Sequence, residues 1–186
     1  MAQYPPAYAW LVPLESWGGL MEPNADPVLV EPVDSEATAA AKRAAMAICG
    51  INSFYWPSAY SRIMEAPESE RGPLVEEFYR DNYWAPMNAG GIDCQCLANK
   101  YLDAGVNQGS GTAQRLMQEA VVALRVPLTV DGAVGPISLE AINRCDPDAL
   151  VASFTARRLV AYARVARSPE EFARWKARAT KVCNPG

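Results

Sequence analysis

Apolar side chains recur at three- and four-residue spacing through most of the chain, and this pattern constrains the fold more than any other feature. One such face in residues 112–124 carries Leu116, Met117, Ala120, Val121 and Leu124. No segment alternates apolar and polar residues for more than a few positions. The sequence therefore predicts an all-α protein of six to eight helices, with room for one short β-hairpin near the N-terminus.

Capping residues and breakers place the ends of these helices. We expect helices over residues 7–17, 35–49, 73–83, 97–106, 112–124, 137–144, 147–167 and a last one from residue 169. Ser35 and Asp146 can cap two of them, and Ser168 with Glu171 forms a capping box. Gly105 weakens its own helix, which indicates close approach by another helix. Residues 18–34 are rich in proline and predict a loop or a hairpin with Val28–Val30 as a strand.

The length of 186 residues fits one domain, or two small ones packed as a single globule. The longest apolar runs fall well short of the ~18 residues that a membrane-spanning helix needs, so we expect no membrane span. Residues 1–10 carry two prolines and no basic residue, so we expect no secretory signal peptide.

The chain contains no histidine, which removes many common active sites. A Ser-His-Asp triad, a Cys-His dyad and zinc sites built on imidazole all need this side chain. Any general acid or base must therefore be a carboxylate, Lys, Tyr or Cys.

The odd number of five cysteines leaves at least one thiol unpaired in a monomer, and the single residue between Cys94 and Cys96 does not match a metal knuckle. We expect reduced, partly buried thiols and no metal site, with an interchain disulfide left open.

Charge is distributed unevenly. Residues 1–150 hold 9 basic and 19 acidic side chains, whereas residues 151–186 hold 8 basic and 2 acidic ones. The basic end is suited to an anionic polymer or an acidic partner surface, and equally to an ordinary solvated helix face. The low pI of about 5.0 argues against nucleic acid as a partner.

Three motifs in residues 74–163 resemble a known family. Phe78-Tyr79-Arg80-Asp81-Asn82-Tyr83-Trp84, Leu102-Asp103-Ala104-Gly105-Val106-Asn107-Gln108-Gly109 and Asp131-Gly132-Ala133-Val134-Gly135-Pro136 occur in order. Their order and spacing are similar to those of glycoside hydrolase family 108, phage-type N-acetylmuramidases with a predicted peptidoglycan domain as C-terminal half. The resemblance implies a lysozyme-like helical bundle, with a degenerate catalytic-type half in 1–90 and the peptidoglycan-domain half in 91–186.

The resemblance also implies a catalytic pair. The family's Glu-Gly-Gly motif has its nearest match in Glu15-Ser16-Trp17-Gly18-Gly19, where the glutamate lies two residues early, and Asp26 has the expected spacing from Gly19. Glu15 would be the general acid and Asp26 the assisting carboxylate, with Glu22 and Glu31 as reserves. The family's Gly-Gly-x-Thr segment has no counterpart after Asp26.

Three further residues are candidates for substrate binding. Tyr83 and Trp84 would form a sugar-stacking wall, or else belong to the core. Asn107 lies at a helix end before Gly109 and would bind substrate or cap that helix. Asp131 is expected to hold its own glycine turn. The resemblance implies neither a cofactor nor a metal.

Two functions follow from the resemblance. The first is a muramidase that cuts the β-1,4 bond between N-acetylmuramic acid and N-acetylglucosamine in peptidoglycan, as a phage endolysin or virion-associated lysin. The second is a non-catalytic, lysozyme-fold structural component of a phage particle with other phage structural proteins as partners. Both place the protein in the virion, or in the host cytoplasm or periplasm during lysis.

Overall fold

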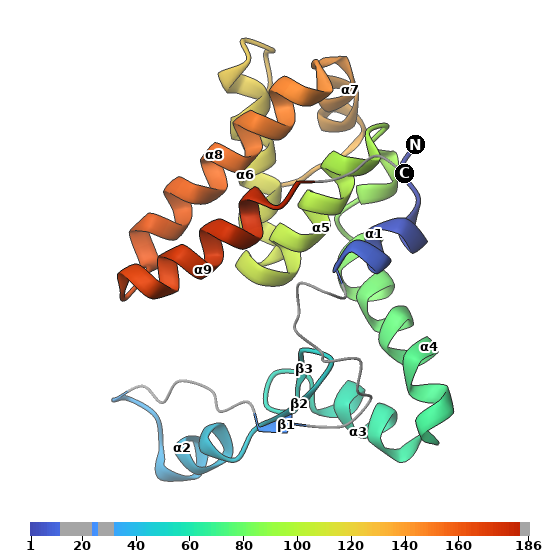
Figure 1. The fold of residues 1–186 in the computed structure, drawn as a ribbon, viewed down its shortest axis with the longest axis vertical. Helices are drawn as coiled ribbons and strands as arrows, with labels where there is room; N and C mark the ends of the chain where they lie inside the picture. The colour runs from blue at the N-terminus through green and yellow to red at the C-terminus, as the bar shows by residue number, and fades with distance from the viewer. Residues whose placement is uncertain (12–23, 26–31, 183–186) are drawn as a thin grey trace. The chain divides into compact units, whose positions relative to one another are not determined.

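The computed structural model describes residues 1–11, 24–25 and 32–182 of the chain. Within these residues the fold is all-α with one short antiparallel sheet, which confirms the predicted class (Figure 1). Two compact units are present: a helical unit of Met1–Leu11 and Arg80–Gly186, and a hairpin unit of Val12–Tyr79. The functional halves 1–90 and 91–186 are a different division of the chain and stay a prediction.

The helical unit is built around one buried helix, α5 (Gln95–Gln108). Helices α1 (Tyr4–Leu11), α6 (Ser110–Ala123) and α8 (Pro147–Val165) all pack on it, and α9 (Pro169–Thr180) packs on α8. The unit is completed by α7 (Pro136–Arg144), a π-helical turn η2 (Arg80–Trp84) and a 3-10 turn η3 (Ala89–Gly91). Nine consecutive residues of α5, from Leu97 to Gly105, are buried, so this helix forms the core on nearly every side.

The predicted caps of the last two helices are confirmed. Asp146 accepts a hydrogen bond from the backbone N–H of Ala149 at 2.9 Å, and Ser168 accepts one from Glu171 at 3.2 Å. The Glu171 carboxylate accepts a hydrogen bond from the backbone N–H of Arg167 at 2.8 Å. In a regular capping box it would accept from the N–H of the cap residue, Ser168. These bonds satisfy N–H groups that the helices themselves leave unpaired.

A buried carboxylate joins three helices of this unit. Asp103 of α5 is fully buried and accepts hydrogen bonds from Arg158 of α8 and Arg178 of α9, both at 2.6 Å. The remaining donors of Arg158 reach Gln108 at 2.9 Å and the Lys100 carbonyl at 3.4 Å. Every part of the Arg158 guanidinium therefore has a partner, which is the condition under which a buried ion pair is tolerated.

Tyr162 extends this network from α8. Its hydroxyl accepts a hydrogen bond from Arg158 at 3.1 Å and donates one to the side-chain oxygen of Asn107. Burial raises the pKa of Tyr162, so the hydroxyl stays protonated and able to donate. Its ring stacks on Trp175 of α9 with centroids 5.2 Å apart. The ring and hydroxyl of Tyr162 thus link α5, α8 and α9 a second time.

The hairpin unit holds the strands β1 (Asn24–Ala25), β2 (Met46–Ile48) and β3 (Ile51–Asn52) in the order β1-β2-β3, all antiparallel. Its helices are α2 (Glu36–Arg43), α3 (Pro57–Glu65) and α4 (Glu68–Tyr79). Cys49 and Gly50 connect β2 to β3 with φ of 50° and 76°, the backbone that a two-residue hairpin turn requires. The Tyr79 hydroxyl donates to the Cys49 carbonyl at 2.8 Å and anchors this turn to α4.

Several predicted boundaries in the N-terminal part are wrong. The helix expected over 35–49 ends at Arg43, because Met46–Ile48 pair as a strand with Ile51–Asn52. No helix was expected between residues 50 and 72, where α3 lies, and the helix expected over 73–83 begins at Glu68, so that Pro73 lies inside α4. The helix expected over 7–17 begins at Tyr4, while residues 12–17 and the proposed strand Val28–Val30 lie outside the described residues.

Gly105 does mark a close approach, but not by another helix. A Cβ at this position would overlap the sulfur of Met87, a fully buried side chain between η2 and η3. The glycine therefore leaves room for a methionine of a connecting segment. In the described part of the chain, no helix is long and apolar enough to cross a membrane.

Replacing Asp103 by Asn is expected to destabilise the protein strongly. The substitution leaves the fully buried Arg158 without its anionic partner, and losing one member of a buried pair costs about 3–5 kcal/mol. Urea unfolding followed by circular dichroism measures this loss. Glu140→Gln, which removes an exposed carboxylate of α7, is the matched control and should change the free energy of unfolding by less than about 0.5 kcal/mol. Equal stability of the two variants would contradict the role of Asp103.

Candidate binding groove

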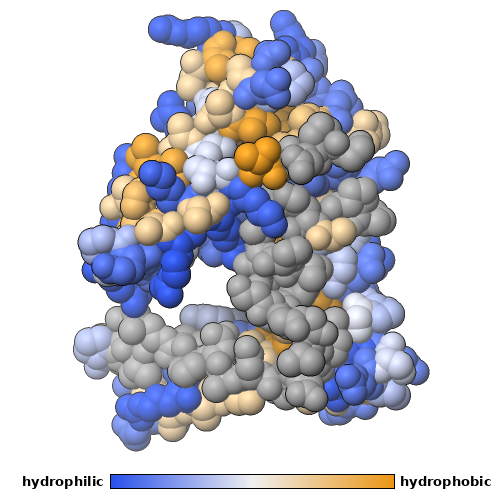
Figure 2. Space-filling view, in the orientation of Figure 1, coloured by the Kyte–Doolittle hydropathy of each residue, from blue (hydrophilic) through white to orange (hydrophobic). Residues whose placement is uncertain are grey.

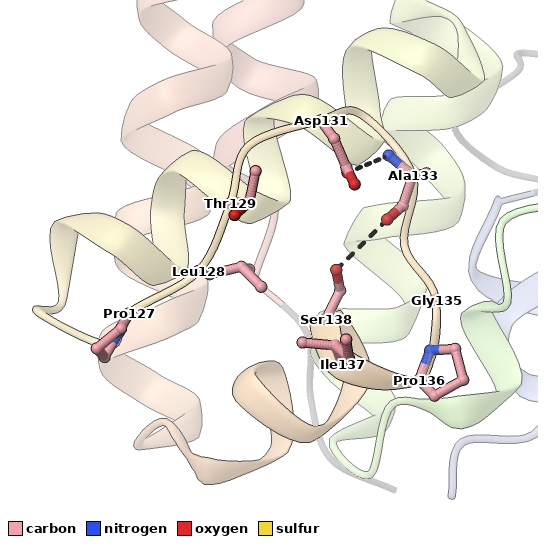
Figure 3. A pocket seen from close by; sticks show the side chains of 9 residues that line it. All are labelled: Pro127, Leu128, Thr129, Asp131, Ala133, Gly135, Pro136, Ile137 and Ser138. Carbon is pink, nitrogen blue, oxygen red and sulfur yellow. Dashed lines mark hydrogen bonds between the residues drawn. The ribbon is translucent and has the colours of Figure 1, made fainter.

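A groove of about 830 Å³ lies along the segment that connects α6 to α7 (Figure 3). It is lined by nine residues of this segment and of the first turn of α7: Pro127, Leu128, Thr129, Asp131, Ala133, Gly135, Pro136, Ile137 and Ser138. The Asp-Gly-x-x-Gly-Pro motif of the sequence forms one wall. The motif therefore marks the site, and the residues before and after it complete the groove.

The buried side chain of Gln118 in α6 fixes the shape of this loop. Its amide nitrogen donates to the Asp131 carboxylate at 2.7 Å, to the Ala133 carbonyl at 3.0 Å and to the Ser138 hydroxyl at 3.1 Å. Its amide oxygen accepts a hydrogen bond from the backbone N–H of Gly132 at 2.7 Å. One side chain of a packed helix thus holds four points of the loop, so the groove is formed before any ligand arrives.

Two further amides hold Val134, which is buried at the base of the loop. The backbone N–H of Val134 donates to Gln114 of α6 at 2.9 Å, and the Val134 carbonyl accepts from Asn88 at 2.8 Å. Gly132 has φ of 82°, a left-handed backbone that disfavours side chains, and the guanidinium of Arg115 lies 3.2 Å from where a Cβ would stand. The backbone of the turn therefore requires the glycine, whereas the flexible end of Arg115 could move aside.

The groove combines apolar surface with a few polar groups. Figure 3 shows Leu128, Ile137 and Ser138 pointing toward the space that the loop encloses, with Pro127 and Pro136 at its two ends. Ile137 is 78% exposed and adds apolar surface to the groove. The hydroxyl of the exposed Thr129 and the Asp131 carboxylate supply polar contacts. This mixture is typical of a surface that binds a ligand having both apolar and hydroxyl groups.

The electrostatics of the groove favour binding over catalysis. Hydrogen bonds from Gln118 and from the Ala133 backbone lower the pKa of Asp131, so its carboxylate stays ionised and cannot act as a general acid near neutral pH. The Ser138 hydroxyl donates to the Ala133 carbonyl at 3.4 Å and accepts from Gln118 at 3.1 Å, so it serves to hold the loop. Within the described residues, no cluster of three or more Cys, Asp or Glu side chains could hold a metal ion.

The proposed catalytic residues lie elsewhere in the chain. Glu15 and Asp26, with the reserves Glu22 and Glu31, fall outside the described residues, so their separation stays untested. The hypothesis of a carboxylate pair therefore rests on the sequence resemblance alone.

The three predicted substrate-binding residues lie in the helical unit. Trp84 is 8% exposed and packs its ring against Tyr4 of α1 with centroids 5.6 Å apart, while Tyr83 beside it in η2 is half-buried. Asn107 lies in the last turn of α5 and accepts the hydrogen bond from Tyr162. The structure places none of these residues in the lining of the groove.

The sequence analysis singled out the loop but missed the residues that build the groove around it. Asp131 does hold its own turn, since its carboxylate accepts from the backbone N–H of Ala133 at 2.9 Å. Gln118 and Gln114 gave no signal, because a glutamine on a helix usually lies in solvent. The exposed Ile137 directly after Gly135-Pro136 was the available clue, since this position begins a helix with an apolar residue on its outer face.

Comparison with known proteins assigns a class to this part of the chain. Residues 112–180, which include the whole groove, match the family described as "Predicted Peptidoglycan domain". The C-terminal part of the protein is therefore similar to the domains of this family over residues 112–180.

A solved structure shares the fold over nearly the whole chain. It is entitled "Structure of Brucella abortus SagA", and the similarity has a TM-score of 0.56 at 16% sequence identity over 95% of each chain. At this identity the likeness concerns the fold. No curated protein matches the chain significantly.

Replacing Gln118 by Met is expected to raise the pKa of Asp131 toward its ordinary value of 3.8, because the largest cause of the lowered pKa is the hydrogen bond from Gln118. In the wild type, the ionised Asp131 stabilises the loop above about pH 4, and this contribution is lost as pH falls through the lowered pKa. Carboxyl-carbon NMR titration of Asp131 measures the change.

Gln114→Met is the matched control, because Gln114 holds the same loop through Val134 without contacting Asp131. In this variant the pKa of Asp131 should remain low. An equal rise of the pKa in both variants would show that loop disorder, not the hydrogen bond, controls Asp131.

Proposed function

We propose that the groove beside α7 binds peptidoglycan. The observation that carries this proposal is the coincidence of the groove with residues 112–180, which match the predicted peptidoglycan domain. Peptidoglycan offers sugar hydroxyls, methyl groups and peptide amides. These groups suit the apolar side chains of Leu128 and Ile137, the hydroxyl of Thr129 and the carboxylate of Asp131.

The proposal extends to cleavage of the glycan strand by residues of the N-terminal part. Glu15 would protonate the leaving oxygen of the β-1,4 bond between N-acetylmuramic acid and N-acetylglucosamine, and Asp26 would assist from the other side. The resemblance to family 108 muramidases supports these roles, and the absence of histidine leaves carboxylates as the natural acid and base. The protein would then act as a phage endolysin or virion-associated lysin during host lysis.

A second candidate function follows from one departure in the sequence. The Gly-Gly-x-Thr segment expected after Asp26 is missing, and this segment faces substrate in the family. Its loss favours a protein that keeps the lysozyme-like fold and serves as a non-catalytic, wall-contacting component of a phage particle. Binding to peptidoglycan through the groove is common to both functions.

The groove proposal predicts that Ile137→Asp weakens binding to purified peptidoglycan about tenfold, since a charge replaces the most exposed apolar side chain of the groove. An aspartate in the first turn of α7 is compatible with the helix dipole, so the fold should persist. Sedimentation of the protein with sacculi measures the affinity. Val160→Asp, at a half-exposed position of α8, is the control and should bind as the wild type does.

The cleavage proposal predicts that the wild type releases fragments with muramic acid at the reducing end, and that Glu15→Gln releases none. Turbidity clearing and mass spectrometry of the products measure both. Cleavage that survives in Glu15→Gln would remove this residue from the site and direct attention to Glu22 and Glu31. Binding without any cleavage, at several pH values, would favour the structural component.

A further inference from the structure

The hairpin unit exposes aromatic side chains that its core does not use. Tyr55 is 63% exposed and Trp56 is 37% exposed, directly after the short strand β3. Together with the half-buried Phe54, they form three successive aromatic residues between β3 and α3. We call Ser53–Trp56 the aromatic turn. Two adjacent exposed aromatic side chains offer apolar surface to a ligand.

Hydrogen bonds hold the backbone of the aromatic turn in one shape. The Asn52 side chain accepts from the backbone N–H of Phe54 at 2.8 Å, and the Asn52 carbonyl accepts from Trp56 at 2.9 Å. Ser53 donates its backbone N–H to the Met46 carbonyl at 2.7 Å, and its hydroxyl accepts from the Met46 backbone at 2.9 Å. The turn is thus fastened to the edge of the sheet, and its rings are presented from a rigid support.

Neighbouring rings fix the orientation of the exposed ones. Tyr55 meets Phe54 edge to face with centroids 5.4 Å apart, and Trp56 meets Phe78 of α4 in the same way at 5.0 Å. The ammonium group of Lys42 lies over the Phe54 ring at 5.8 Å. Phe54 and Phe78 therefore act as supports, while the ring of Tyr55 keeps most of its surface in solvent.

We propose that the aromatic turn is a second carbohydrate-binding site, which stacks Tyr55 and Trp56 on the apolar face of a pyranose ring of the N-acetylglucosamine type. This inference rests on the proposed binding of peptidoglycan and assigns the glycan strand to the hairpin unit. A pyranose has one face of C–H groups and a rim of hydroxyls, which complements an aromatic face bordered by polar groups. Rigid aromatic side chains also lose little conformational entropy on binding.

The negative net charge of the hairpin unit favours an uncharged ligand at the aromatic turn. Residues 12–79 carry 11 acidic and 4 basic side chains, so the unit repels anionic lipid surfaces and nucleic acids. The Lys42 ammonium near the turn is paired with Asp34 at 2.7 Å. An uncharged, N-acetylated amino sugar therefore suits both the aromatic side chains and the net charge of the unit.

Because a glycan is a polymer, a second site of low affinity can still raise the total affinity for it. Both units belong to one polypeptide, so a glycan chain bound through the groove stays tethered to the protein that carries the aromatic turn. The second contact then forms at a high effective concentration, even when its own affinity is low. Weak stacking at Tyr55 would thus increase the total affinity for sacculi without a deep pocket.

The test uses the full chain and chitotetraose, an uncharged β-1,4-linked N-acetylglucosamine oligomer, with binding followed by tryptophan fluorescence and by NMR. Tyr55→Ala should weaken binding about fivefold or more, whereas Tyr55→Trp, which keeps a stacking face, should retain it. Val33→Ala is the matched control, because Val33 is an apolar side chain of the same unit that is 93% exposed. This variant should bind as the wild type does.

Sacculus binding separates this inference from the proposed function. If Ile137→Asp loses sacculi while Tyr55→Ala binds chitotetraose as the wild type does, the groove proposal stands and the aromatic turn is not a sugar site. The same conclusion follows if the wild type binds no chitotetraose. Binding of neutral phosphatidylcholine vesicles that Tyr55→Ala abolishes, without sugar binding, would also overturn the inference in favour of a membrane surface. If sacculi bind neither through Ile137 nor through Tyr55, the proposed function itself fails.

Discussion

The helical unit depends on the hydrogen-bonded ion pairs that the Asp103 carboxylate makes with the guanidinium groups of Arg158 and Arg178. Arg158 and Arg178 follow Asp103 by 55 and 75 positions in the sequence. The network therefore forms only when α5, α8 and α9 have packed together. Removing the charges from water is costly, and the cost is offset only when each donor finds its acceptor. A shifted helix would leave a buried charge without a partner, so the network selects one arrangement of the bundle.

The same principle shapes the groove at the other end of the unit. Gln118 lies on α6, beside residues that fill the core, and its buried amide would be unfavourable there without partners. The loop supplies these partners through Asp131, Gly132, Ala133 and Ser138. Because α6 is itself fixed by α5 and α8, the position of the loop follows from the packing of the bundle. A ligand that enters the groove therefore orders little of the protein, and more of its contact energy becomes affinity.

The sequence predicted best what depends on neighbouring residues. The late helices followed from their caps and their periodicity, because Asp146 and Ser168 act within three residues of themselves. The sequence failed where pairing with another segment determines the secondary structure. Met46–Ile48 were predicted to be helical, but they form a strand that pairs with Ile51–Asn52. Trp84 was compatible with a sugar-stacking wall and with the core, and the sequence could not show that it is buried against Tyr4, eighty residues earlier. Gln118 gave no signal for the groove, because a buried amide is recognised only through the loop that satisfies it.

In the proposed function, binding and bond cleavage fall to different parts of this chain. The groove offers an ionised Asp131 and a hydrogen-bonded Ser138, and neither can deliver a proton to a leaving oxygen. A general acid would have to be another carboxylate, or a Lys, Tyr or Cys, and the hairpin unit holds 11 of the 21 carboxylates in the chain. Such a division of roles suits a polymeric substrate, because a strand bound through one repeat stays tethered to the protein while other repeats meet other groups. A long glycan strand is therefore a substrate on which separate binding and cleaving groups can act together.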